Sequence, residues 1–99
     1  MKVGVVGLGS IGLRHAQNLR ELGHEVVGFD PDERKMWDFQ GHTVARLACF
    51  CGTDAVVIAS PSEQHVHDLH TAVAYGVPPL IEKPLAMAVT DELLAMIAE

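Results

Sequence analysis

Three glycines near the N-terminus, Gly7, Gly9 and Gly12, stand in the spacing G-x-G-x-x-G. In such a loop the first glycine permits a tight turn. The second has no Cβ and lets a pyrophosphate approach the backbone, and the third lets a helix pack closely on a strand. The residues that follow, beginning with Ser10 and Ile11, suit a helix, whose first N–H groups and positive dipole end attract phosphate. The spacing therefore predicts that these five residues bind the diphosphate of a dinucleotide.

An acidic residue, Asp30, ends the next apolar stretch, 18 residues beyond Gly12. This is near the roughly 20-residue spacing expected for the carboxylate that hydrogen-bonds an adenosine ribose. A carboxylate at this position repels a 2′-phosphate, so we predict NAD as the cofactor in preference to NADP. Two observations leave alternatives open: Arg34 is close enough in sequence to meet a phosphate, and Asp30 could simply begin a turn with Pro31.

Two further groups of side chains have the types that bind metals. His67 and His70 lie three residues apart, a ligand spacing on a helix, but no acidic or cysteine partner stands at a complementary spacing. Cys49 and Cys51 are two residues apart, too close for an ordinary disulfide. They form either a Cys-x-Cys metal site or, as we favour, part of a packed segment. We therefore predict no metal site, and a reduced, cytoplasmic protein.

Two polar residues follow later apolar segments. His65 comes shortly after the apolar run 55–59, and ligands bind at the carboxyl ends of parallel strands, so His65 either lines a cofactor cleft or caps a helix. Lys83 is the only basic residue between positions 51 and 99. Desolvation would lower its pKa and a nearby carboxylate would raise it. In either state it could hydrogen-bond a substrate hydroxyl beside a nicotinamide, or it could be a surface lysine on a turn.

Strand and helix patterns alternate along the chain, which predicts an α/β fold with a doubly wound parallel sheet of about five strands. The continuous apolar run 55–59 is typical of a central strand buried on both faces. Segment 46–52 is ambiguous between a helical turn and a loop. The predicted strands are residues 2–6, 25–29, 41–45, 55–59 and 80–82, and the predicted helices are 11–22, 31–39, 63–75 and one beginning near Thr90.

The helical periodicity also predicts which positions face the sheet. In helix 11–22 these are Ile11, Ala16, Leu19 and Leu22, and in helix 63–75 they are Val66, Leu69 and Val73.

Composition excludes two classes of partner. The net charge is −6, and residues 51–99 hold seven acidic side chains against one basic side chain, which argues against nucleic acid. No apolar run approaches the roughly 18 residues that a membrane span needs, so we predict no membrane partner.

Four motifs in order resemble the N-terminal domain of the Gfo/Idh/MocA oxidoreductases, which include glucose–fructose oxidoreductase and inositol 2-dehydrogenase. They are the glycine loop with His15, then Asp30, then Ser60-Pro61-Ser62-Glu63-Gln64-His65, and finally Glu82-Lys83-Pro84-Leu85-Ala86. The resemblance implies a Rossmann-like fold in which Lys83 is catalytic and contacts substrate and nicotinamide. It also implies that Ser60, Pro61, His65 and Glu82 border the cofactor.

Members of that family are much longer and carry a second domain that holds most of the substrate pocket. We therefore expect residues 1–99 to be an incomplete dinucleotide-binding domain, truncated before strand six, with the substrate domain absent and no activity alone. The parent would oxidise a secondary alcohol of a sugar or polyol such as inositol. The alternatives are a stand-alone, non-catalytic dinucleotide-binding module, or a redox-sensing or CoA-binding domain, which the motif at Lys83 disfavours. We also expect a homo-oligomer, formed through the sheet edge at 80–82 or the C-terminal segment.

Overall fold

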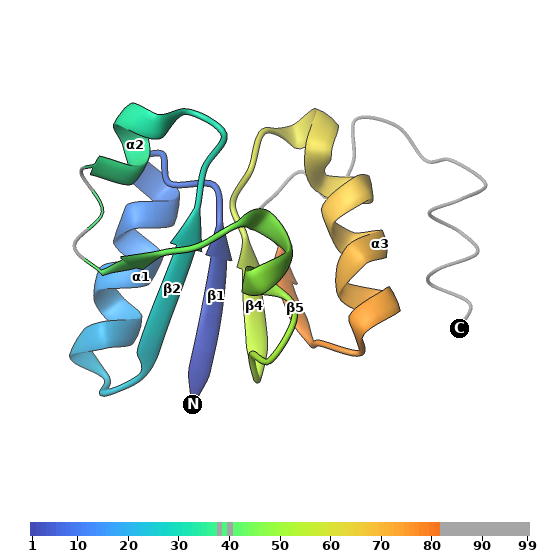
Figure 1. The fold of residues 1–99 in the computed structure, drawn as a ribbon, viewed down its shortest axis with the longest axis horizontal. Helices are drawn as coiled ribbons and strands as arrows, with labels where there is room; N and C mark the ends of the chain where they lie inside the picture. The colour runs from blue at the N-terminus through green and yellow to red at the C-terminus, as the bar shows by residue number, and fades with distance from the viewer. Residues whose placement is uncertain (38, 40, 82–99) are drawn as a thin grey trace.

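The computed structural model describes residues 1–37, 39 and 41–81. Within this part of the chain, five parallel strands form one sheet in the order β3-β2-β1-β4-β5 (Figure 1). The strands are β1 (Lys2–Val6), β2 (Glu25–Phe29), β3 (His42–Thr43), β4 (Ala55–Ile58) and β5 (Pro79–Ile81). The α-helices are α1 (Ser10–Glu21), α2 (Glu33–Trp37) and α3 (His65–Tyr75), and the short 3₁₀-helices are η1 (Arg46–Cys49) and η2 (Ser62–Gln64).

The sheet has a separate apolar core on each face, as the prediction of a doubly wound fold requires. One core joins Val3, Val5 and Val26 to Ala16 of α1 and to Phe39. The other packs strand residues against α3, η1 and the segments beside them, through Cys49, Phe50, Val56, Ile58, Ala72 and Val77. Because β1 pairs with β2 on one side and with β4 on the other, its carboxyl end lies between theirs. The strand order therefore reverses at β1, which is where ligands bind in such sheets.

The helix faces differ from those that the sequence predicts. In α1, Ile11 is 50% exposed, whereas Gly12 and Ala16 are buried. Leu22, the residue that directly follows α1, is 74% exposed. The predicted stripe was wrong at both ends because, at about 100° per residue, positions 11 and 22 lie more than 90° around the helix axis from Ala16. The middle of the predicted stripe is confirmed, since Ala16 is buried and Leu19 packs on the core together with Leu13.

The face of α3 is also displaced by one position. The buried residues are His65, Asp68 and Ala72, whereas Val73 is 42% exposed. Sequence periodicity selects the apolar side chains, but this helix buries two polar ones that have partners. Segment 46–52, ambiguous in sequence, begins with the 3₁₀-helix η1. The predicted helix near Thr90, like Glu82 and Lys83, lies outside the described residues.

Candidate dinucleotide site

The glycine loop connects β1 to α1, and two of its glycines have no room for a side chain. Gly7 has a φ of +96°, and a Cβ there would stand 2.6 Å from backbone atoms of Ala59 and Ser60. A Cβ on Gly12 would collide with the carbonyl oxygen of Gly7. Glycine at these positions lets the loop, the end of β4 and the start of α1 lie close together.

Gly9 differs, because a Cβ there would meet nothing within 4 Å. Open space therefore lies over the N-terminus of α1. Gly9 is the N-cap of this helix and provides no side-chain hydrogen bond to it, and the first N–H groups of a helix have no partner within the helix. The loop is thus open where a diphosphate would approach Gly9, Ser10, Ile11 and Gly12, and these residues fit that group.

Asp30 lies directly after β2 and is 6% exposed. Its Oδ2 accepts a hydrogen bond of 2.8 Å from the backbone N–H of Leu8, within the glycine loop. Its Oδ1 accepts one of 2.8 Å from the N–H of Asp32, which closes a turn. The carboxylate therefore faces the glycine loop from the neighbouring strand. The turn with Pro31, an alternative in the sequence, is present as well, so Asp30 both begins a turn and faces the loop.

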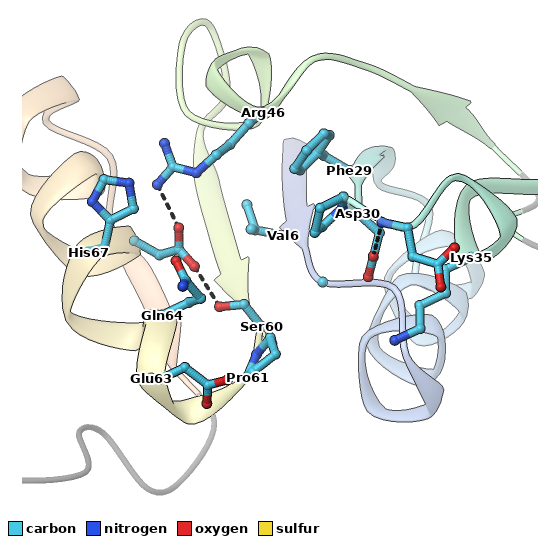
Figure 2. Close-up of a pocket in the computed structure, with 14 residues that line it drawn as sticks. Val6, Phe29, Asp30, Lys35, Arg46, Ser60, Pro61, Glu63, Gln64 and His67 are labelled. Atoms are coloured by element: carbon cyan, nitrogen blue, oxygen red, sulfur yellow. Dashed lines mark hydrogen bonds and ion pairs between the residues drawn. The ribbon is translucent and has the colours of Figure 1, made fainter.

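A cleft of about 580 Å³ opens at this edge of the sheet (Figure 2). Figure 2 shows Phe29, Asp30 and Lys35 on one side, and Ser60, Pro61, Glu63, Gln64 and His67 on the other. The lining residues are Val6, Gly7, Phe29, Asp30, Pro31, Asp32, Lys35, Arg46, Ser60, Pro61, Glu63, Gln64, His67 and Asp68.

The sequence-predicted site residues are placed as follows. Gly7, Asp30, Ser60 and Pro61 line the cleft, and Gly9, Ser10, Ile11 and Gly12 belong to the adjoining loop and helix start.

His65 is not among the residues that line this cleft. It is 2% exposed, and its Nε2 is 2.7 Å from the carbonyl oxygen of Ser60. One contact of His65 is thus with the loop after β4, and it links this loop to α3. His65 is the first residue of α3, and this contact reaches back to the preceding loop. Its predicted place beside the cofactor stays a prediction.

A buried polar network spans the wall of the cleft and was missed in the sequence. Asp68 of α3 accepts hydrogen bonds from the hydroxyl of Ser60 and from Nη2 of Arg46, the latter at 2.6 Å. The same Nη2 donates to Thr71 at 3.0 Å. One signal could have revealed the network: Asp68 stands three residues after His65 and four before Ala72, so it shares their buried helix face.

Two cationic side chains follow Asp30 in the sequence, and the structure places them differently. The Arg34 side chain is 81% exposed and pairs with Asp32 at 3.4 Å, and Lys35 lines the cleft instead. The hydrogen bonds that Arg34 donates hold the pKa of Asp32 below its usual range.

The candidate metal ligands do not come together. Among the described residues, no three His, Cys, Asp or Glu side chains could hold a metal ion. Cys49 is buried and Cys51 is exposed, and neither is bonded in a disulfide. Burial raises the pKa of the Cys49 thiol to about 12.

No helix within the described part of the chain is long and apolar enough to cross a bilayer.

A parallel sheet with a glycine loop at its switch point, and an acid one strand away facing that loop, defines a dinucleotide-binding domain of the Rossmann type. The family described as "Oxidoreductase family, NAD-binding Rossmann fold", Gfo/Idh/MocA, matches residues 1–99. The chain belongs to this family, and its cofactor is NAD.

Relatives of the chain include two proteins named as dehydrogenases. It is 34% identical over 110 residues to inositol 2-dehydrogenase 4 of Saccharopolyspora erythraea, covering 100% of this chain and 32% of that protein. It is 30% identical over 102 residues to UDP-N-acetylglucosamine 3-dehydrogenase of Acidithiobacillus ferrooxidans, covering 98% and 32%. The chain thus spans about a third of the length of these curated relatives.

Solved structures share the fold. A crystal structure of the Acidithiobacillus ferrooxidans enzyme has a TM-score of 0.83 at 29% identity, covering 99% of this chain and 33% of that one. An oxidoreductase from Agrobacterium radiobacter, solved with NAD⁺, L-tartaric acid and magnesium, has a TM-score of 0.80 at 21% identity, covering 99% and 31%. At 21% identity, the similarity to the Agrobacterium radiobacter structure shows only that the fold is shared.

Proposed function

We propose that this chain is the cofactor domain of a dehydrogenase that transfers a hydride between a secondary alcohol of a sugar or polyol and the nicotinamide of NAD. One observation carries the proposal: the carboxylate of Asp30 is held at the carboxyl end of β2, facing a glycine loop that is open over Gly9. The relatives that act on inositol and on a sugar nucleotide support the choice of substrate class.

In this proposal the chain's own residues bind and orient the cofactor. The N-terminus of α1 holds the diphosphate, Asp30 accepts a hydrogen bond from the adenosine ribose, and Ser60 and Pro61 border the other side of the cleft. NAD, when bound, supplies the hydride acceptor. His65 keeps the loop at Ser60 in place through its carbonyl oxygen.

The proposal also includes Lys83 and Glu82, which lie outside the described residues. Lys83 would contact the substrate hydroxyl and the nicotinamide, and Glu82 would border the cofactor. We further propose that the substrate pocket, the proton-accepting base and a sixth strand belong to sequence beyond these 99 residues. The chain matches only about a third of the length of its relatives, which agrees with this proposal. We also propose a cytoplasmic location for this protein.

The test is a titration of NAD and NADH into the 99-residue chain, followed by heat or by the fluorescence of Trp37. We expect binding by a folded chain, and no binding at millimolar cofactor would contradict the proposal. Trp37 is 76% exposed, so heat is the primary measurement. In a longer protein carrying the substrate domain, Lys83→Ala should lower kcat far more than cofactor affinity, and an equal loss in both would remove its assigned role.

A second candidate function is a stand-alone dinucleotide-binding module without turnover. The glycine loop and Asp30 would serve such a module equally well, because both features bind the cofactor and neither performs the hydride transfer. Neither candidate predicts turnover by the 99 residues alone, so NAD reduction with sugars and inositols by this chain would contradict both. The same assay on a longer protein that carries a substrate domain separates them, because only the first candidate predicts turnover there.

A further inference from the structure

The side chain of Arg46 lines the cleft but belongs to none of the motifs that predicted the dinucleotide site. Its guanidinium lies over the ring of Phe50, with Cζ 5.2 Å from the ring centroid. Phe50 is fully buried, whereas Arg46 lines the cleft. The guanidinium therefore has a buried aromatic ring on one side, and the exposed quarter of the Arg46 side chain borders the cleft.

The guanidinium is also held in one orientation. Nη2 donates to the buried carboxylate of Asp68 at 2.6 Å and to the hydroxyl of Thr71 at 3.0 Å. These partners belong to α3, whereas Arg46 belongs to η1, so the plane is fixed between two elements. Preorganisation of this kind lowers the side-chain entropy lost when a ligand packs on the plane.

The ion pair determines what kind of ligand suits Arg46. The Asp68 side chain is 3% exposed and stands against the Arg46 side chain, which is 25% exposed. Because this carboxylate neutralises the cation at close range, Arg46 is a poor site for a phosphate. What remains is a flat, polarisable surface, and guanidinium planes stack well on aromatic rings and nucleobases.

The position of Asp30 indicates which ring would reach this surface. In the proposed complex Asp30 binds the adenosine ribose, so the adenine attached to that ribose must lie in the same cleft. Phe29, the residue before Asp30, packs against the core cluster that contains Phe50. Figure 2 shows Phe29 and Arg46 at the same end of the cleft.

We propose that the cleft-facing side of the Arg46 guanidinium is the stacking surface for the adenine of the dinucleotide, with Asp68 and Thr71 as positioning residues. This rests on the proposed function, since it uses the ribose position that Asp30 defines. It adds a residue to the site that the sequence motifs do not contain.

The experiment compares ADP with inorganic pyrophosphate as ligands of the 99-residue chain, measured by calorimetry. Both carry a diphosphate for the glycine loop, but only ADP has a base. Arg46→Lys retains the charge and can keep the pair with Asp68 while removing the plane. We expect it to weaken ADP binding about fivefold, as loss of one base stack predicts, and to leave pyrophosphate binding within about twofold.

Thr71→Val serves as a second variant that removes one hydrogen bond to Nη2 and keeps Arg46. It should weaken ADP binding in the same direction by a smaller factor. Saturation-transfer NMR on the wild-type complex should give stronger signals from the adenine protons than from the ribose protons, and Arg46→Lys should abolish this difference.

Two results would overturn the assignment. Equal loss of ADP and pyrophosphate in Arg46→Lys would mean that Arg46 acts through the fold or through charge, and unchanged ADP binding would mean that the base lies elsewhere. Failure of the proposed function looks different, because the wild-type chain would then bind neither NAD nor ADP.

Discussion

Asp30 joins two parts of the site through a single carboxylate. One oxygen accepts the N–H of Leu8 in the glycine loop and the other accepts the N–H of Asp32. An amide at this position has one acceptor oxygen and one donor group, so it cannot accept both hydrogen bonds. The residue is thus required both for the shape of the loop and for the proposed contact with ribose.

Asp30→Asn should therefore weaken NAD binding about tenfold and lower the free energy of unfolding by about 1–3 kcal/mol, because one buried N–H loses its partner. Calorimetry with NAD and urea denaturation measure the two effects. Glu33→Gln is the matched control, since Glu33 is an exposed acid just beyond the same strand and does not line the cleft. Equal effects of both substitutions would contradict a specific role for Asp30.

The two cysteines should differ sharply in reactivity. Burial raises the pKa of Cys49 to about 12 from an ordinary value of 9.0, so its thiol stays protonated and enclosed in the folded chain, whereas Cys51 is exposed. At pH 8 we expect one thiol per native chain to react rapidly with a disulfide reagent, and the second only after unfolding. In Cys51→Ser the rapid reaction should disappear; its persistence would show that Cys49 is accessible.

The same shift predicts the direction of a pH effect on stability. The folded-state pKa of Cys49 lies above its unfolded value, so both states bind the proton below about pH 9. Between about pH 9 and pH 12 the unfolded chain loses the proton first, and stability falls as pH rises. Urea denaturation across this window should show a smaller decline in Cys49→Ala than in the wild type.

At the scale of elements, the β1–α1 connection separates two uses of glycine. A Cβ at Gly12 would collide with the carbonyl oxygen of Gly7, whereas a Cβ at Gly9 meets nothing. Gly9→Ala should therefore fold with a melting temperature near that of the wild type, yet bind NAD at least about tenfold more weakly, because the methyl group occupies the space proposed for the diphosphate.

Gly12→Ala provides the contrast, since it should lower thermal stability as well as binding by forcing α1 away from β1. Circular dichroism melts and NAD titrations of both variants test this pair. If Gly9→Ala bound NAD as tightly as the wild type, the open space at Gly9 would not be the diphosphate site.

The sequence predicted the strands well because four of the five are apolar segments bounded by glycine, proline or acidic residues, and their parallel order follows from the alternation with helices. It predicted helix faces less well. Periodicity assigns apolar side chains to the core, so it could not anticipate that α3 buries His65 and Asp68 through hydrogen bonds to Ser60 and Arg46. Those partners lie in other segments, and only the fold brings them together.

At the scale of the whole molecule, the two faces of the sheet have different tasks. The core beneath α1 supports the glycine loop, and the core beneath α3 and η1 supports Phe29, Phe50 and the polar network at Asp68. The cleft lies where these two halves meet, so the site depends on the assembled sheet. This explains why residues such as Gly7 and Asp30, which follow single strands, were predictable, whereas Arg46 was not.

The last strand of the described sheet leads to a prediction about self-association. β5 pairs with β4 on one side, and its Leu80 is 58% exposed. Val73 and Tyr75 of α3 are also exposed, at 42% and 46%. A strand with an exposed apolar side chain can pair or pack with a second copy.

We therefore expect the 99-residue chain to self-associate as its concentration rises. Leu80→Lys should shift the chain toward the monomer, because a charge on this strand opposes association. Light scattering measures the change, with Leu22→Lys as the control, since Leu22 is 74% exposed at the far end of α1. A wild-type chain that stays monomeric at high concentration would contradict the prediction.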